Sequence, residues 1–357
     1  MKKLSKNTIS NFITYGIVIA AFVIVTILLN AGALSRSMKG QLVPICVYIV
    51  MAVSLNLTVG ISGELSLGHA GFMSVGAFSG VVAVACMADS SIQPTLQMVI
   101  ALVCGGLIAA IAGVIIGIPV LRLRGDYLAI VTLAFGEIIR NVLNCLYVAL
   151  DGGKLLVTFN TPITQSLESI QAGNRFMMVI NGPQGGTVAT KLSNFTIGFA
   201  LVMFTLIVVL NLINSRSGRA IMAIRDNRIA AESVGVGATR YKMMAFVISA
   251  TLAGMAGALY AMNYSSVDAS KFKFDTSIKV LVFVVLGGIG NIRGSVIAAT
   301  LLTVLPELLR AFNDYRMLIY AVVLILVMIG GNNETIRNAL SKPFKWIGAK
   351  FGKGGDQ

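Results

Sequence analysis

Residues 214–242 read NSRSGRAIMAIRDNRIAAESVGVGATRYK, a polar segment set between long apolar stretches. A short basic segment between membrane-spanning helices belongs on the cytoplasmic side. The pattern predicts a short helix over 226–234, with Asp226 at its start and Gly235 and Gly237 closing it. Such an ordered basic turn suits a docking surface for a cytoplasmic partner; the alternative is that its charge only fixes the topology. Its charged residues are Arg216, Arg219, Arg225, Arg228, Arg240 and Lys242, against Asp226 and Glu232.

The rest of the chain is apolar enough to lie in a lipid bilayer. Of its 357 residues, 56% are hydrophobic and 12% are charged, which is about half the charged fraction of soluble domains. We therefore predict an all-α polytopic membrane protein. The net charge of +14 lies mostly in loops and tails, where it orients the protein, so it does not indicate nucleic acid binding. The four cysteines form no CxxC pair and fit small apolar core positions.

The apolar stretches predict about ten membrane-spanning helices. With both termini in the cytoplasm, the inner segments carry more Lys and Arg than the outer ones, as the positive-inside rule requires. The predicted organisation is a cytoplasmic tip and first span at 1–40, a membrane-embedded core at 41–330 and a cytoplasmic tail at 331–357. The core holds an extracytoplasmic loop at 149–193 and the cytoplasmic loop at 214–242. The predicted spans are 12–30, 41–59, 69–88, 96–118, 127–148, 195–213, 243–263, 278–290, 295–310 and 317–330.

The extracytoplasmic loop contains turn residues such as Asp151-Gly152-Gly153. It predicts a small cap with a short helix near 163–172. The cap is either a solvated linker or a surface for an outer partner, and its length does not distinguish the two.

Two of the predicted spans are broken or short. The second continues into GISGELSLGHAGF at 60–72, and the eighth reads only IKVLVFVVLGGIG at 278–290. Broken helices at membrane depth are buried in protein or line a wet cavity, and they are common at translocation sites. Both breaks place a glycine-rich turn before a helix of small residues, which favours an internal repeat. The residues assigned to the path or the break are Asn56, Gly63, Ser66, Gly68, His69, Glu137 and Arg140.

Few residues of this sequence suit catalytic chemistry. His69 is the single histidine, without a cysteine or carboxylate cluster, so it fits a polar residue at the helix break better than a metal ligand. Glu137 and Arg140 lie three positions apart near the middle of the fifth span, where they can pair. They are either part of a translocation path or a structural ion pair. No metal-ligand pattern and no GxxxxGK[ST] phosphate-binding loop occurs.

Four long blocks are familiar. They are GELSLGHAGFMSVGAF at 63–78, VLRLRGDYLAIVTLAFGEIIRNVL at 120–143, GRAIMAIRDNRIAAESVGVGATRYKMMAFVISATLAGMAGALYA at 218–261 and VLGGIGNIRGSVIAATLLTVLPELLR at 285–310. In these blocks the chain resembles the permease subunits of branched-chain amino acid ABC importers, of the LivM type. The resemblance covers roughly 41–330 and leaves out the C-terminal tail.

The resemblance implies an ABC importer permease fold of ten helices, whose halves form an inverted internal repeat. The basic loop would be the coupling loop, which sits in a groove on a cytoplasmic ATPase and needs small residues for close approach. The chain would hold no cofactor, because ATP is bound by the partner ATPase subunits. The implied coupling residues are Arg225, Asp226, Ala230, Ala231, Glu232, Gly235 and Gly237.

The implied partners are a second, LivH-type permease subunit, two cytoplasmic ATPase subunits and an extracytoplasmic solute-binding protein, within the lipids of a bacterial plasma (inner) membrane. The implied function is uptake of Leu, Ile and Val by alternating access, with no enzyme activity in this chain. Alternatives are a family member with another cargo, such as another amino acid, urea or an amide, and a sugar-type ABC permease. A stand-alone secondary transporter is a further alternative, with Glu137 as its ion site.

Overall fold

The computed structural model describes residues 6–32, 35–88, 92–123, 125–152, 154–163, 176–188, 191–310, 315 and 318–325. The chain divides into two compact units, Met1–Thr300 and Leu301–Gln357, and the contacts discussed below lie within the first. The predicted tail at 331–357 lies outside the described residues, as do 317 and 326–330 of the tenth predicted span.

Each predicted span from the first to the ninth overlaps a helix, although the fifth, at 127–148, extends beyond Asn144, where its helix ends, into a strand that begins at Leu146. Five segments are long and apolar enough to cross a membrane within the part of the chain that the structure describes: Arg36–Ile61, His69–Cys86, Pro94–Val120, Phe195–Asn214 and Ala238–Ala261. The helices are α1 Lys6–Asn30, α2 Arg36–Asn56, α3 His69–Cys86, α4 Pro94–Val120, α5 Asp126–Asn144, α7 Phe195–Asn214, α8 Arg216–Asp226, α9 Arg228–Ser233, α10 Ala238–Ala261, α11 Phe274–Gly287 and α12 Ile292–Leu308.

Small residues bring α10 against α3 and α4 in the core. A Cβ atom on Gly76 of α3 would lie 2.0 Å from the carbonyl oxygen of Gly254 on α10, and one on Gly257 would lie 1.9 Å from that of Met73. A Cβ atom on Gly254 would also meet the Cβ of Ala109 on α4 at 2.3 Å. Packing of this kind, in which backbones approach closely, holds helices together where burial from water contributes little.

The outer faces of α1 and α4 are apolar. Ile24, Ile111 and Ile115 are among the side chains that remain exposed on these two helices. Exposed apolar surface of this extent is unusual on a soluble protein and is the ordinary surface of a helix that faces lipid.

The expectation of an all-α chain is wrong for the outer loop, which forms an antiparallel sheet. The β-branched and aromatic residues of LYVALD and KLLVTF favour strands, and the Gly-Gly sequence between them is typical of a hairpin. The predicted helix near 163–172 lies almost wholly outside the described residues. The strands, in the spatial order β2-β1-β3-β4-β5, are β2 Lys154–Phe159, β1 Leu146–Asp151, β3 Phe176–Asn181, β4 Gly186–Thr187 and β5 Ser266–Val267.

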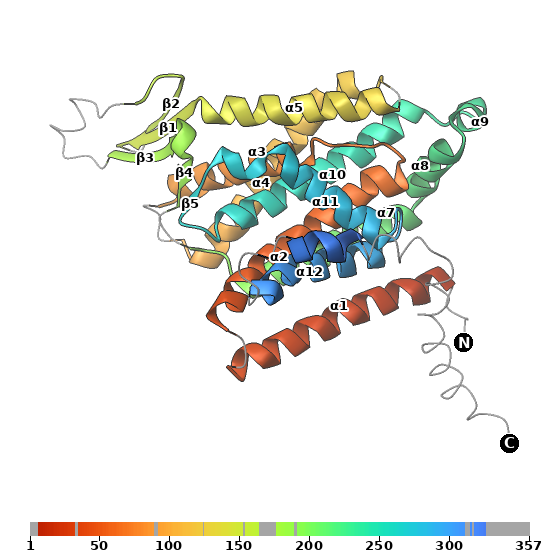
Figure 1. The fold of residues 1–357 in the computed structure, drawn as a ribbon. Coiled ribbons are helices and arrows are strands. Elements are labelled where there is room, and N and C mark those ends of the chain that lie inside the picture. The colour runs from red at the N-terminus through yellow and green to blue at the C-terminus, as the bar shows by residue number, and fades with distance from the viewer. Residues whose placement is uncertain are drawn as a thin grey trace. The chain divides into compact units, whose positions relative to one another are not determined.

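The sheet and the basic segment occupy opposite ends of the first unit. The strands gather at one end of its helices, whereas α8 and α9 lie at the other end (Figure 1). Helix α1 begins at the end where α8 and α9 lie (Figure 1). The first unit therefore has two chemically distinct ends, one with a sheet and one with a short basic helix pair.

Candidate coupling and translocation site

The break after α2 is a π-helical turn followed by extended backbone. Helix α2 continues into the π-turn η1, Leu57–Ile61, and α3 starts only at His69. The backbone turns at Gly63, whose φ of +73° favours glycine. A π-turn disturbs the regular pattern of backbone hydrogen bonds and is frequent at functional sites.

Arg225, at the end of α8, binds this break directly. Its Nη1 donates a hydrogen bond to the carbonyl oxygen of Gly60 over 2.9 Å. Its Nε and Nη2 donate to Oδ1 of Asp226 over 3.0 and 2.9 Å. A Cβ atom on Gly63 would lie 2.6 Å from Cγ of Arg225, so the glycine leaves room for the arginine stem. The basic segment and the helix break, predicted separately from the sequence, thus touch.

A second cation from the same segment holds the break from α10. Lys242 forms an ion pair with Glu64, and these side chains are only 15% and 11% exposed, respectively. Exposed ion pairs contribute little, but charges that are removed from water and left unpaired are costly. Arg225 and Lys242 therefore fix 60–64 between α8 and α10.

Asn56 joins this break to the glycine turn that follows α11. The backbone N–H of Gly290 donates to Oδ1 of Asn56 over 2.8 Å, and Nδ2 of Asn56 donates to Oγ of Ser295 over 2.7 Å. A Cβ atom on Gly60 would lie 2.3 Å from the Gly290 nitrogen. The two broken spans therefore meet backbone to backbone.

Helices α5 and α11 complete the surroundings of the break. The N–H of Leu67 donates to Oγ1 of Thr132 over 3.0 Å, and the N–H of Ala70 donates to Oγ of Ser277 over 3.1 Å. A Cβ atom on Gly68 would lie 2.2 Å from the carbonyl oxygen of Thr132. Freed backbone groups at membrane depth need partners of this kind.

His69 is buried at the start of α3. Its Nε2 lies 2.8 Å from Oγ of Ser54, which belongs to α2. It therefore bonds a side chain across the helix break. Within the residues that the structure describes, no group of three or more His, Cys, Asp or Glu side chains is placed to hold a metal ion.

Three hydroxyl groups in and beside the break have no hydrogen-bond partner among the described residues. They belong to Thr58, Ser62 and Ser66, all three of which are buried. Buried hydroxyls are normally satisfied by protein or by water. Neutral polar groups in this position can exchange partners with water or with a small solute.

Glu137 and Arg140 pair as predicted from their spacing. Nε of Arg140 donates to Oε2 of Glu137 over 2.7 Å. The other carboxylate oxygen accepts the N–H of Phe274, the first residue of α11, over 3.3 Å. A carboxylate at a helix N-terminus is favourable. Both oxygens of Glu137 therefore have structural partners.

The basic segment folds as two helices, which corrects the predicted start of the short helix. Asp226 ends α8, and Asn227 caps α9 by accepting the N–H of Ala230 over 3.1 Å. Asparagine is favoured there because α8 and α9 meet at an extended residue, and its side chain satisfies a free N–H. Gly235, with a φ of +84°, follows α9 as predicted.

The side chains of α9 do not all face outward. Ala231 is 5% exposed and packs with Ile224 and Ala238 inside the chain, contrary to our interpretation of it as a docking residue. Ile229 and Val234 are instead 81% and 78% exposed. Apolar side chains so exposed at the polar end of the unit indicate a contact surface. Ala230, Glu232, Gly235 and Gly237 are also exposed.

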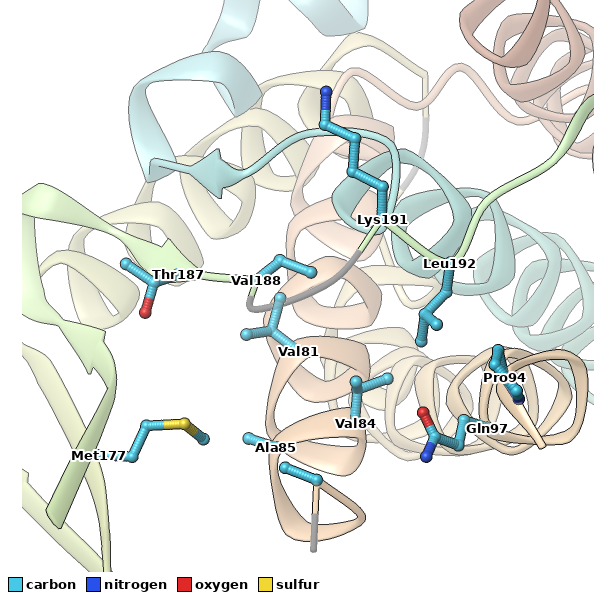
Figure 2. A pocket seen from close by; sticks show the side chains of 11 residues that line it. Val81, Val84, Ala85, Pro94, Gln97, Met177, Thr187, Val188, Lys191 and Leu192 are labelled. Carbon is cyan, nitrogen blue, oxygen red and sulfur yellow. The ribbon is translucent and has the colours of Figure 1, made fainter. Parts of the chain in front are cut away.

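The sheet end holds a cavity of about 410 Å³. Figure 2 shows Val81, Val84 and Ala85 of α3 on one side and Met177 of β3 on another. Gln97 also lines it and donates to the carbonyl oxygens of Met87 and Ile92. The cavity is apolar, lacks charge apart from Lys191, and belongs to the sheet end rather than to the helix break.

Comparison with known proteins identifies the family. Residues 37–328 match the family described as branched-chain amino acid transport system / permease component. The permease protein LivM of the high-affinity branched-chain amino acid transport system is 38% identical in Salmonella typhimurium and 37% identical in Escherichia coli. Each match covers 291 residues, 79% of this chain and 66% of the relative.

More distant relatives include another permease protein of a high-affinity branched-chain amino acid transport system. LivH of Salmonella typhimurium is 24% identical over 298 residues, which cover 79% of this chain and 88% of the relative. The chain thus spans slightly less than two thirds of the LivM proteins and most of LivH. No solved structure is significantly similar.

These relatives carry permease names, in agreement with the predicted type of protein. The family match extends over both helix breaks, the basic segment and the sheet. The apolar helices agree with a multi-pass membrane protein. The chain belongs to the family of branched-chain amino acid transport system permease components.

Proposed function

We propose that this chain is the membrane-spanning permease subunit of an ATP-driven importer, which moves branched-chain amino acids into the cytoplasm by alternating access. Its partners are a second, LivH-type permease, two cytoplasmic ATPase subunits that bind ATP, and an extracytoplasmic solute-binding protein. The chain holds no cofactor and has no enzyme activity of its own.

The contact between Arg225 and Gly60 is the observation that carries this proposal. A force applied to α8 acts on the break through Arg225. A force that reaches α10 acts on the same stretch through Lys242 and Glu64. Asn56 extends the connection to Gly290 and the second break. Alternating access requires an element with two arrangements that a partner can bias, and two touching helix breaks are suited to this role.

The orientation follows from the two ends of the first unit. The end with α8 and α9 is cytoplasmic in this proposal, and α1 begins there (Figure 1), which supports a cytoplasmic N-terminus in the plasma membrane.

Ten spans and an inverted repeat remain part of the proposal. Helices α2 and α11 run in the same direction, because Tyr48 faces Lys279 and Asn56 faces Gly290, so these two breaks are not an inverted pair.

Ile229 and Val234 form the proposed docking face for the ATPase. Ile229 is the second residue of α9 and Val234 directly follows the helix, whereas Ala231 packs the helix against the rest of the chain. An apolar anchor surrounded by charged residues is the usual composition of a contact centre. The small residues Ala230 and Gly235 beside it permit close approach.

Ile229→Glu is expected to reduce co-purification of the ATPase subunits at least tenfold. The substitution places a charge in an interface centre, where desolvation costs several kcal/mol. The measurement is the amount of ATPase recovered with tagged permease from detergent-solubilised membranes.

Ala223→Glu is the matched control, since it adds the same charge at an exposed position of α8. It should leave recovery of the ATPase unchanged. If Ile229→Glu recovers as much ATPase as Ala223→Glu, α9 is not the docking face.

The break also fits a small, neutral path. Thr58, Ser62 and Ser66 present buried hydroxyls and no charge, which suits a transient passage for a zwitterion or another small polar solute. Specificity for leucine, isoleucine and valine then rests largely with the solute-binding protein.

Glu137→Gln is expected to leave ATP-dependent uptake within about twofold of wild type. The amide oxygen still accepts the N–H of Phe274, and a partly exposed ion pair contributes only about 0–1 kcal/mol. The measurement is uptake of labelled leucine in vesicles at several pH values. Loss of uptake together with normal expression would instead support the secondary transporter, in which Glu137 carries an ion.

A further inference from the structure

Lys279 places an ammonium group among aromatic rings in the middle of the helices. It is the sixth residue of α11, about 7.5 Å along the helix axis from Phe274. Its Nζ lies 4.6 Å from the ring centroid of Tyr48 and 6.0 Å from that of Phe283. The two rings meet edge to face at 5.8 Å. A lysine over aromatic faces is a cation–π arrangement.

The lysine does not extend toward the sheet end, where water would be close. Tyr48 is the thirteenth residue of α2 and lies about 18 Å from the start of that helix. Lysines near the ends of spans commonly direct their ammonium groups to the interface. Lys279 reaches instead to the centre of α2, so its position needs another explanation.

Lys279 differs from Arg140 and Lys242 in having no anionic partner among the residues that the structure describes. Arg140 pairs with Glu137, and Lys242 pairs with Glu64. No hydrogen bond or ion pair joins Lys279 to any other residue that the structure describes. A cation–π contact stabilises an ammonium group less than its removal from water destabilises it. The described residues therefore compensate this charge only in part.

The position of Lys279 also connects it to the proposed path. Lys279 and Tyr48 lie on α11 and α2, each eight residues before the end of its helix, or about 12 Å along the axis. The same two helices meet again through Asn56 and Gly290. Lys279 and Tyr48 are both half-buried and reach the surface of the chain, so a group from outside can approach the ammonium.

We propose that Lys279 and Tyr48 form a carboxylate-binding site that an anion from outside this chain completes. The proposal rests on the proposed function, which supplies two sources of such a carboxylate. One is the α-carboxylate of an amino acid cargo, with Tyr48 and Phe283 as apolar neighbours of its side chain. The other is an acidic side chain of the second permease subunit.

The test uses the assembled importer and two substitutions. Lys279→Met keeps the apolar stem and removes the charge, whereas Lys279→Arg keeps the charge and the aromatic contact. Lys273→Met is the matched control, because Lys273 is exposed immediately before α11. The measurements are recovery of the second permease subunit, thermal stability, and labelled leucine taken up per ATP hydrolysed.

We expect Lys279→Met to match or exceed wild-type thermal stability while leucine uptake per ATP hydrolysed falls at least tenfold. Lys279→Arg should retain most of the wild-type uptake. Normal recovery of the second subunit with loss of uptake identifies the cargo as the source of the carboxylate. Loss of the second subunit identifies that subunit as the source of the carboxylate.

Unchanged uptake and recovery in Lys279→Met would overturn the proposal, and so would a loss that arginine does not restore. Failure of the proposed function is separate, since it would appear in the wild-type chain as uptake that does not depend on ATP.

Discussion

Arg225→Met is expected to lower leucine uptake per ATP hydrolysed roughly ten- to hundredfold, because a hydrogen bond from a charged group contributes about 1.5–3 kcal/mol. Methionine keeps a stem beside Gly63 but removes the donor to the carbonyl oxygen of Gly60. The ATPase subunits should still bind, since Ile229 and Val234 are unchanged. The variant should therefore hydrolyse ATP without transport, which is the signature of lost coupling.

Arg228→Met is the control for this prediction. Arg228 lies on α9 and pairs with Glu232 over 2.9 Å, so the change removes the same charge from the same segment without touching the break. Its uptake per ATP should remain within about twofold of wild type, because exposed pairs contribute about 0–1 kcal/mol. An equal loss in both variants would mean that the total charge of the segment matters rather than the contact with Gly60.

Asn56→Leu is expected to reduce uptake about tenfold or more with little effect on ATPase association. Leucine has a similar size but leaves the N–H of Gly290 and the hydroxyl of Ser295 without the asparagine. An unsatisfied buried donor costs about 1–3 kcal/mol. Ser295→Ala removes only one of these partners and should have a smaller effect.

The double variant of Arg225→Met and Asn56→Leu tests whether the two residues act on uptake together or independently. If both residues act on the same pair of breaks, their effects on uptake per ATP should not add, as expected for coupled positions. Full additivity, or normal uptake in Asn56→Leu, would show that Asn56 does not couple Arg225 to the second helix break.

The sequence predicted the helices well because long apolar stretches are a strong signal. It also located both glycine breaks and the basic segment. It could not show that Arg225 binds Gly60 or that Asn56 binds Gly290, because these pairs are 165 and 234 positions apart. Hydrophobic pattern reports which face of a helix is buried and says nothing of which distant segment covers it.

The outer sheet and the exposed apolar residues of the proposed docking face were missed for different reasons. Strand β5 comes about eighty residues after β4, so local pattern could not predict the sheet, although the hairpin of β1 and β2 had a signal in its turn. In the basic segment, the small residues pointed to Ala231, which the structure buries. Ile229 and Val234 are apolar residues in a polar segment, and the structure leaves them exposed.

The central claim is that this chain transports a cargo only when ATPase subunits act on its basic segment. The direct test is uptake of labelled leucine by proteoliposomes that contain the wild-type chain, the second permease and both ATPase subunits. We expect uptake that requires ATP on the side of the membrane where the ATPase subunits lie. It should also require the loaded solute-binding protein on the opposite side. Uptake driven by a proton or sodium gradient, without ATP or ATPase, would contradict it.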